Sequence, residues 1–270
     1  MKLFRLVSIA AASLLLPGTF SIFAAQPALP THQDPFSKEV AALPAEGQVE
    51  RVMAKLKQMN RGFVASETHK VENEKVTEFS LHTTSPLKEI SALRALVNLQ
   101  KLECIIGTPD IATLDLRPLH AMSLTELKLR HITVNDLRPL SAMPLVILNL
   151  DACRIPDLSP LKGIRLKRLS LWSTSIPDLA PLAGMPLEWL NCSKTKVRDL
   201  SPLKGAPLKV LCCDDTDVSN LSALEGMPLQ ILRCDVKAAK RNAKTLQSIS
   251  TLEKINDIPA AEFLKTVKNR

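Results

Sequence analysis

Residues 187–207, which read LEWLNCSKTKVRDLSPLKGAP, decide the architecture of this chain. Leucine or cysteine stands at the first, fourth and sixth places of the stretch, and a second apolar set follows at Val197, Leu200 and Leu203. The fourth and sixth side chains of an extended segment point to one face, because side chains alternate along a strand. The stretch therefore predicts a short strand and then a turn, whose apolar residues enter one shared core.

The same pattern recurs every 21 residues through the middle of the chain. A motif of Asp, Leu, any residue, Pro and Leu begins at Asp136, Asp157, Asp178 and Asp199. The full spacing matches the leucine-rich-repeat signature, with Thr in the Asn/Cys place. We therefore predict an α/β leucine-rich-repeat solenoid at residues 76–251, with about eight repeats, a parallel strand ladder on the concave face and short helical turns on the convex face.

Composition agrees with a thin core built from leucine. The 270 residues include 45 leucines, only 3% aromatic residues and no tyrosine. Small polar residues receive structural roles in this scheme. Ser159 and Ser201 precede proline and are expected to cap the helical turns. Thr174, Thr195 and Thr216 stack one repeat apart and are expected to bond the backbone of neighbouring loops.

Residues 1–25 have the pattern of a secretory signal peptide. Two basic residues precede an apolar run at residues 6–16, and small residues suit cleavage after Ala24 or Ala25. The apolar run is shorter than the roughly 20 residues that span a bilayer. We therefore expect export to the periplasm or outside the cell, no transmembrane segment after cleavage, and a flexible proline-rich leader at residues 26–43.

Both ends of a solenoid expose core and need a cap. An N-terminal cap is predicted at residues 44–75, with a helix at about 45–60 and then a pair of short strands that reaches residue 79. A C-terminal cap is predicted at residues 252–270, and residues 238–249 before it are predicted to be helical. One helical stripe supports the first of these helices: Val49, Val52, Met53, Leu56 and Met59.

The positive charge of the chain is concentrated near its C-terminus. Residues 236–270 hold eight Lys or Arg against three Asp or Glu, while the formal net charge of the whole chain is +8. A basic tail could favour an anionic lipid surface, cell-wall polymer or nucleic acid. It lacks interleaved aromatic residues, and a solvated helix face is the more frequent meaning of such a tail, so nucleic acid is disfavoured as a partner.

The repeat at residues 187–207 resembles the internalin-like arrays of bacterial leucine-rich-repeat proteins. More narrowly, it is similar to arrays of environmental bacteria that stand alone in an exported protein or follow a Ser/Thr kinase domain. Residues 43–63 and 251–263 also resemble the flanking segments of that group. The resemblance covers about residues 43–270. The chain departs from that group in having no kinase or other enzymatic module attached. The resemblance therefore implies a binding array without enzymatic activity, and it offers no ligand residues to carry over.

Cysteine positions follow the repeat. Stacked parallel strands leave the Cβ directions parallel, which does not suit a disulfide, so small buried hydrophobic residues are the favoured interpretation. A metal cluster is disfavoured because no histidine shares the column and no Cys-x-x-Cys pair occurs. Cys212 alone is expected on the concave sheet, as an accessible free thiol. The others are expected in the core: Cys104, Cys153, Cys192, Cys213 and Cys234.

No residue pattern predicts catalysis, a metal site or a cofactor. The five histidines are scattered, and the aspartates follow the repeat period. The concave face is instead the candidate binding surface, with both tryptophans of the chain expected in one patch between basic and acidic flanks. The candidate partner-binding residues are Lys128, Arg130, Ile147, Asn149, Asp151, Trp172, Trp189, Val210, Asp214 and Arg233.

Three hypotheses about function remain open at this point. The favoured one is a non-enzymatic module that binds a partner protein through the concave face. The second is binding of a glycan or a cell-envelope polymer, because tryptophan rings stack on sugars. The third is a purely structural role in the cell envelope, in which the tryptophans merely cover neighbouring strands.

Overall fold

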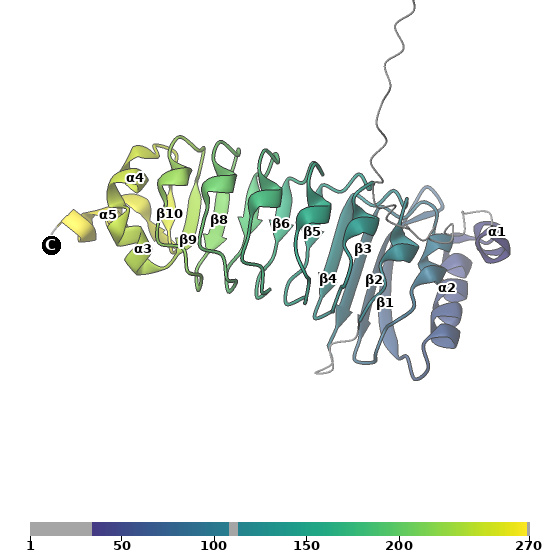
Figure 1. Ribbon diagram of the computed structural model, residues 1–270. Helices are drawn as coiled ribbons and strands as arrows, with labels where there is room; N and C mark the ends of the chain where they lie inside the picture. Colours follow the sequence, from purple (N-terminus) through teal and green to yellow (C-terminus); the bar gives the residue numbers. More distant parts are fainter. Residues whose placement is uncertain (1–33, 108–112, 269–270) are drawn as a thin grey trace, which may run out of the picture.

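The computed structural model describes residues 34–107 and 113–268, and its strands form one sheet of eleven members in chain order (Figure 1). The sheet forms an elongated, curved ladder with short turns along the opposite side, which confirms the predicted solenoid. The predicted signal peptide and the first part of the predicted leader lie outside the described residues. In the part of the chain that is described, no helix is both long and apolar enough to cross a membrane.

The sheet is parallel except at its two ends. Strand β1 (Ala65–Glu72) pairs antiparallel with β2 (Lys75–Thr83), and β10 (Lys254–Ile255) pairs antiparallel with β11 (Ile258–Pro259). The parallel strands between them are β3 (Lys101–Ile106), β4 (Glu126–Arg130), β5 (Ile147–Asn149), β6 (Arg168–Ser170), β7 (Trp189–Asn191), β8 (Val210–Cys213) and β9 (Ile231–Cys234).

Leucines fill the core in columns that follow the strand register. Leu169 pairs with Leu190, and Leu190 with Leu211, and all three side chains are fully buried. The cysteine column lies in the same core, and all six cysteines are free thiols. Each repeat covers the apolar face of its neighbours, so the stability of the array depends on stacking rather than on any single repeat.

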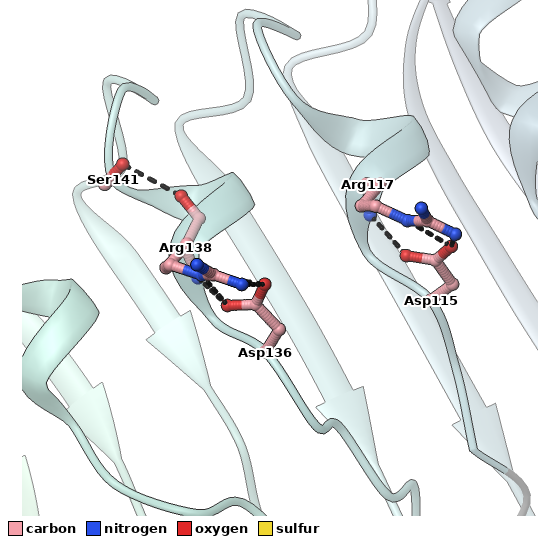
Figure 2. A network of polar contacts seen from close by, with 5 residues as sticks. All are labelled: Asp115, Arg117, Asp136, Arg138 and Ser141. Atoms are coloured by element: carbon pink, nitrogen blue, oxygen red, sulfur yellow. Dashed lines mark hydrogen bonds and ion pairs between the residues drawn. The ribbon is translucent and has the colours of Figure 1, made fainter. Parts of the chain in front are cut away.

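Single 3-10 turns cover the convex side, as the prolines predict, but aspartate caps them rather than serine. The Asp157 carboxylate accepts the backbone N–H of Ser159 at 2.6 Å, and Asp199 accepts that of Ser201 at 2.8 Å. Figure 2 shows two related turns, where arginine also pairs with the capping carboxylate. The turns are η1 (Ser91–Ala95), η2 (Arg117–Leu119), η3 (Arg138–Leu140), η4 (Ser159–Leu161), η5 (Ala180–Leu182), η6 (Ser201–Leu203) and η7 (Ser222–Leu224).

The threonine column is bonded within each repeat, which differs from the predicted ladder between repeats. Thr195 Oγ1 donates to the Cys192 carbonyl at 2.6 Å, and Thr174 donates to Leu171 at 2.8 Å. Each of these hydroxyls satisfies the carbonyl three residues before it. Bonds between neighbouring loops come from the backbone of the sharp bend after each strand, as from Ala152 N–H to the Trp172 carbonyl at 2.7 Å, and from serine hydroxyls, as from Ser193 to Asp214.

Helical caps close both ends, with boundaries that differ from the prediction. Helix α2 (Ala45–Met59) lies where the apolar stripe predicts it, but α1 (Pro35–Ala41) occupies part of the expected flexible leader. The Asp34 side chain caps α1 by accepting the backbone N–H of Ser37, and the helix buries Val40. This helix is too short for its apolar residues to show a helical period in the sequence. At the other end, the helices α3 (Val236–Arg241) and α4 (Ala243–Ser248) lie near the helix predicted at residues 238–249, ahead of α5 (Ala260–Lys268).

Candidate functional site

Three columns of side chains line the concave face, and each takes one residue from each of the six repeats that contain β4 to β9. The strand-start column contains Glu126, Ile147, Arg168, Trp189, Val210 and Ile231. The strand-middle column contains Lys128, Asn149, Ser170, Asn191, Cys212 and Arg233. The strand-end column, two residues further on, contains Arg130, Asp151, Trp172, Ser193, Asp214 and Asp235.

The two tryptophans occupy different columns and therefore different patches. Trp189 pairs with Arg168 in the strand-start column, whereas Trp172 comes four residues after Arg168. At about 3.3 Å per residue for an extended chain, this offset places the two Cα atoms roughly 13 Å apart along the strand direction. The hollow beside Trp189 does not include Trp172, and each ring has its own cation, Arg168 over Trp189 and Lys194 over Trp172.

Trp189 borders a hollow of about 280 Å³ that is lined by residues of β4, β5, β6 and β7. The guanidinium carbon of Arg168 lies 5.1 Å from the centre of the Trp189 ring, which is a cation–π contact. Arg168 itself is exposed, while Trp189 is half-buried. The lining consists of Glu126, Lys128, Ile147, Leu148, Asn149, Arg168, Ser170 and Trp189.

The hollow brings together four of the predicted site residues, namely Lys128, Ile147, Asn149 and Trp189. Arg168 adds the remaining positive charge at its rim and was not among the predicted binding residues. The signal for it was present in the sequence, because Arg168 stands one period before Trp189 in the same column. Lys128 forms an ion pair with Glu126 at 2.6 Å, so its charge is partly neutralised inside the site.

Trp172 lies at the opposite edge of the ladder, and its surroundings are structural. The Lys194 Nζ lies over the Trp172 ring, 5.2 Å from its centre, and the backbone N–H of Trp172 donates to Asp151 Oδ1 at 3.1 Å. Asp151 also accepts the Ser170 hydroxyl and, at 2.9 Å, the side-chain amide of Asn149. These bonds occupy the carboxylate, so Asp151 orders the strand ends and has little capacity left for a partner.

The acidic flank of the predicted site is also partly engaged. Asp214 accepts the Ser193 hydroxyl at 2.8 Å, and Arg233 lies 3.8 Å from the Asp257 carboxylate. Val210 is half-buried beside Trp189 in the strand-start column. These residues lie outside the lining of the hollow.

Cys212 lies on the concave face as predicted, but its environment makes it a weak nucleophile. It is half-buried, and desolvation raises the pKa of its thiol to about 11 although the nearby Arg233 opposes the rise. Burial also raises the pKa of the core thiols, for example that of Cys192 to about 12. Thiolate is the reactive form, so none of these cysteines is activated for nucleophilic chemistry.

The N-terminal part of the concave face is neutralised by its own ion pairs. Lys101 contacts Glu78 at 2.9 Å, and the hydrogen bond and charge of Lys101 lower the pKa of that carboxyl. Arg130 is half-buried, and its Nε lacks a hydrogen-bond partner among the described atoms. Across residues 34–107 and 113–268, no group of three or more His, Cys, Asp or Glu side chains is arranged to hold a metal ion.

Comparison with known proteins identifies the fold and goes no further. Neither a family model nor a curated protein sequence matches the chain. Among solved structures, internalin C2 from Listeria monocytogenes is similar, with 24% identity and a TM-score of 0.59 over 76% of this chain and 91% of that one. The internalin InlF of the same species has 22% identity and a TM-score of 0.57, over 83% of this chain and 76% of that one. The chain thus has the internalin-like leucine-rich-repeat fold that its repeats predict.

Proposed function

We propose that this chain is an exported, non-enzymatic binding module that recognises a partner protein through the hollow beside Trp189. Export is inferred from the signal-like residues 1–25. The internalin-like fold supports a role in protein interaction in general. The hollow supports the more specific placement, because it joins an aromatic side chain, a cation and an apolar wall on the open face of the array.

The stack of Arg168 on Trp189 is the observation that carries the proposal. Tryptophan and arginine are the residues most enriched among those that dominate interface energies. Arg168 makes no ion pair within the described residues, so its guanidinium can donate to a carboxylate of a partner. Ile147 pairs directly with Arg168 and supplies the apolar wall next to that charge. We infer that the partner presents an acidic side chain next to an apolar one.

A glycan is the second candidate, and one observation weighs against it at this position. Sugar rings stack on an open aromatic face, whereas the guanidinium of Arg168 lies over the ring of Trp189. A sugar would have to displace Arg168 or use the edge of the ring. Trp172 is less suitable still, since Lys194 lies over its ring.

Affinity capture with matched variants tests the proposal. The chain and its variants Trp189→Ala, Arg168→Ala and Trp172→Ala are cross-linked to native envelope proteins, and the captured proteins are quantified by mass spectrometry. Loss of a buried anchor weakens binding by about 2 kcal/mol or more, which is roughly thirtyfold in Kd. We expect Trp189→Ala and Arg168→Ala to lose the same protein, and Trp172→Ala, the matched control, to retain it.

The same variants distinguish the proposal from its alternatives. Equal capture by the chain and by Trp189→Ala would refute the placement of the site. A parallel pull-down on cell-wall polymer and a glycan array would reveal the second candidate, through saturable binding that is lost with Trp189→Ala. A purely structural protein would show no saturable ligand in either experiment.

A further inference from the structure

The C-terminal cap carries a stripe of basic side chains along α3 and the start of α4. Lys237, Lys240 and Arg241 share one face of α3, and Lys244 follows at the start of α4, after the break between the two helices at Asn242. All four are exposed, whereas Ala238 and its neighbour Ala239 on the opposite side of α3 are buried. The helix therefore turns its alanines to the core and its charges to solvent.

Some bases of the array are paired with carboxylates, whereas these four, in the described part of the chain, are not. Lys101 is paired with Glu78 and Lys209 with Glu188, each within 3 Å. Within the described residues, no ion pair is formed by any of the four bases of the stripe. Like charges close together on the surface repel one another, and an anionic surface beside them would reduce that repulsion.

An exposed apolar side chain begins the same stripe. Val236 is 48% exposed and lies one helical turn before Lys240, on the same side of α3. The hairpin strand β11 in this cap exposes a second apolar side chain, Ile258, at 42%. A lipid interface takes basic groups and apolar side chains together, whereas a nucleic acid takes the charges and would favour aromatic side chains for stacking.

We propose that the stripe formed by Val236, Lys237, Lys240, Arg241 and Lys244 docks the C-terminal end of the array onto an anionic phospholipid bilayer. The four bases meet the lipid headgroups, and Val236 enters the boundary between headgroups and acyl chains. The concave hollow lies on strands β4 to β7, outside this cap, and stays open for its own partner.

Vesicle co-sedimentation of the full chain tests the docking. The vesicles contain either phosphatidylcholine alone or phosphatidylcholine with one third phosphatidylglycerol. The stripe variant replaces Lys237, Lys240, Arg241 and Lys244 by Gln. Its matched control replaces four exposed bases that make no ion pair elsewhere in the array: Lys162, Arg165, Lys196 and Lys204. Both variants lose the same net charge and keep the same N-terminal residues, and thermal unfolding verifies that each is folded.

Each base near an anionic surface strengthens binding about fivefold, so the stripe variant is expected to bind the phosphatidylglycerol vesicles at least about a hundredfold more weakly. The control is expected to change less than about fivefold. Val236→Asn is expected to weaken binding a few-fold, and 0.5 M NaCl to abolish most of it.

Three results would overturn the docking. The first is no binding of the full chain to the anionic vesicles. The second is an equal loss in the stripe variant and its control, which would mean that net charge alone is responsible. The third is binding to polyphosphate or to a DNA duplex that equals binding to the vesicles and is unaffected by Val236→Asn, because the surface would then serve a soluble polyanion.

Discussion

Replacing Ala152 by glycine is expected to stabilise the solenoid. Five consecutive repeats place a residue other than glycine in the left-handed region directly after the concave face, with φ between 54° and 58°. Ala152 is one of them, at φ 54°, and its backbone N–H donates to the carbonyl of Trp172 at 2.7 Å. That bond links two repeats and fixes the conformation despite its cost.

The size of the effect follows from two opposing contributions. A Cβ in the left-handed conformation costs about 1–2 kcal/mol, which Ala152→Gly removes. Glycine loses more backbone entropy on folding, which costs about 0.5–1 kcal/mol. We therefore expect a net gain of about 0.5–1 kcal/mol in the free energy of unfolding, and a rise of about 1–4 °C in Tm for a domain of this size.

Urea unfolding followed by circular dichroism provides the assay, with Ala183→Gly as the matched control. Ala183 is exposed in the loop after η5 and has φ −57°, where glycine brings no relief. The control is expected to lower the unfolding free energy by about 0.5–1 kcal/mol, opposite in sign to Ala152→Gly. If both substitutions lower it equally, the strained bend is not the reason for the difference.

Two further predictions concern a titrating clamp and a thiol. His69 lies 3.0 Å from Glu67 and 3.0 Å from Glu46 of α2; burial lowers its pKa, but the hydrogen bonds and charges of the two carboxylates outweigh burial and raise it above 6.5. The protonated His69 therefore stabilises the N-terminal cap fully below about pH 6.5, and this stabilisation is lost as pH rises through the raised pKa. The urea midpoint of the chain should fall more between pH 6 and 9 than the midpoint of His69→Gln. Parallel dependence of the two midpoints on pH would contradict this role of His69. Cys212 should be the only cysteine that maleimide modifies in the native chain. With its pKa of about 11, it should react at pH 8 roughly a hundredfold more slowly than a free thiol. Modification of a core cysteine at the same rate would show that the repeats open.

The repeat period predicted the sheet because it fixes both the strand and its neighbours. Once Leu169 and Leu190 occupy equivalent places one period apart, burial of both requires the strands to lie side by side in register. The same logic placed five of the six cysteines in the core and Cys212 on the concave face. Local periodicity also located α2, a helix of fifteen residues with one apolar stripe.

The sequence predicted the faces of the strands better than the positions along them. Trp172 and Trp189 were both predicted on the concave side, but Trp189 begins the three-residue strand β7, whereas Trp172 lies two residues beyond the end of β6. The alternation of side chains along a strand predicts which face of the sheet a side chain lies on, but it does not predict which side chains it contacts there. The bonds of Asp151 with Ser170 and Trp172 depend on that second question, and they became visible only in three dimensions.

Because each repeat contacts only its neighbours, the two proposed surfaces should act independently. The hollow is formed by strands β4 to β7, and the basic stripe begins after β9, so at least one whole repeat, with β8, lies between them. Energetic effects of substitutions that share no contact add within a few tenths of a kcal/mol. Trp189→Ala should therefore leave vesicle binding unchanged, and the stripe variant should still capture the partner protein in solution. A loss of both activities in either variant would instead mean that the array unfolds or bends as one unit, which is inconsistent with stability that comes from nearest neighbours.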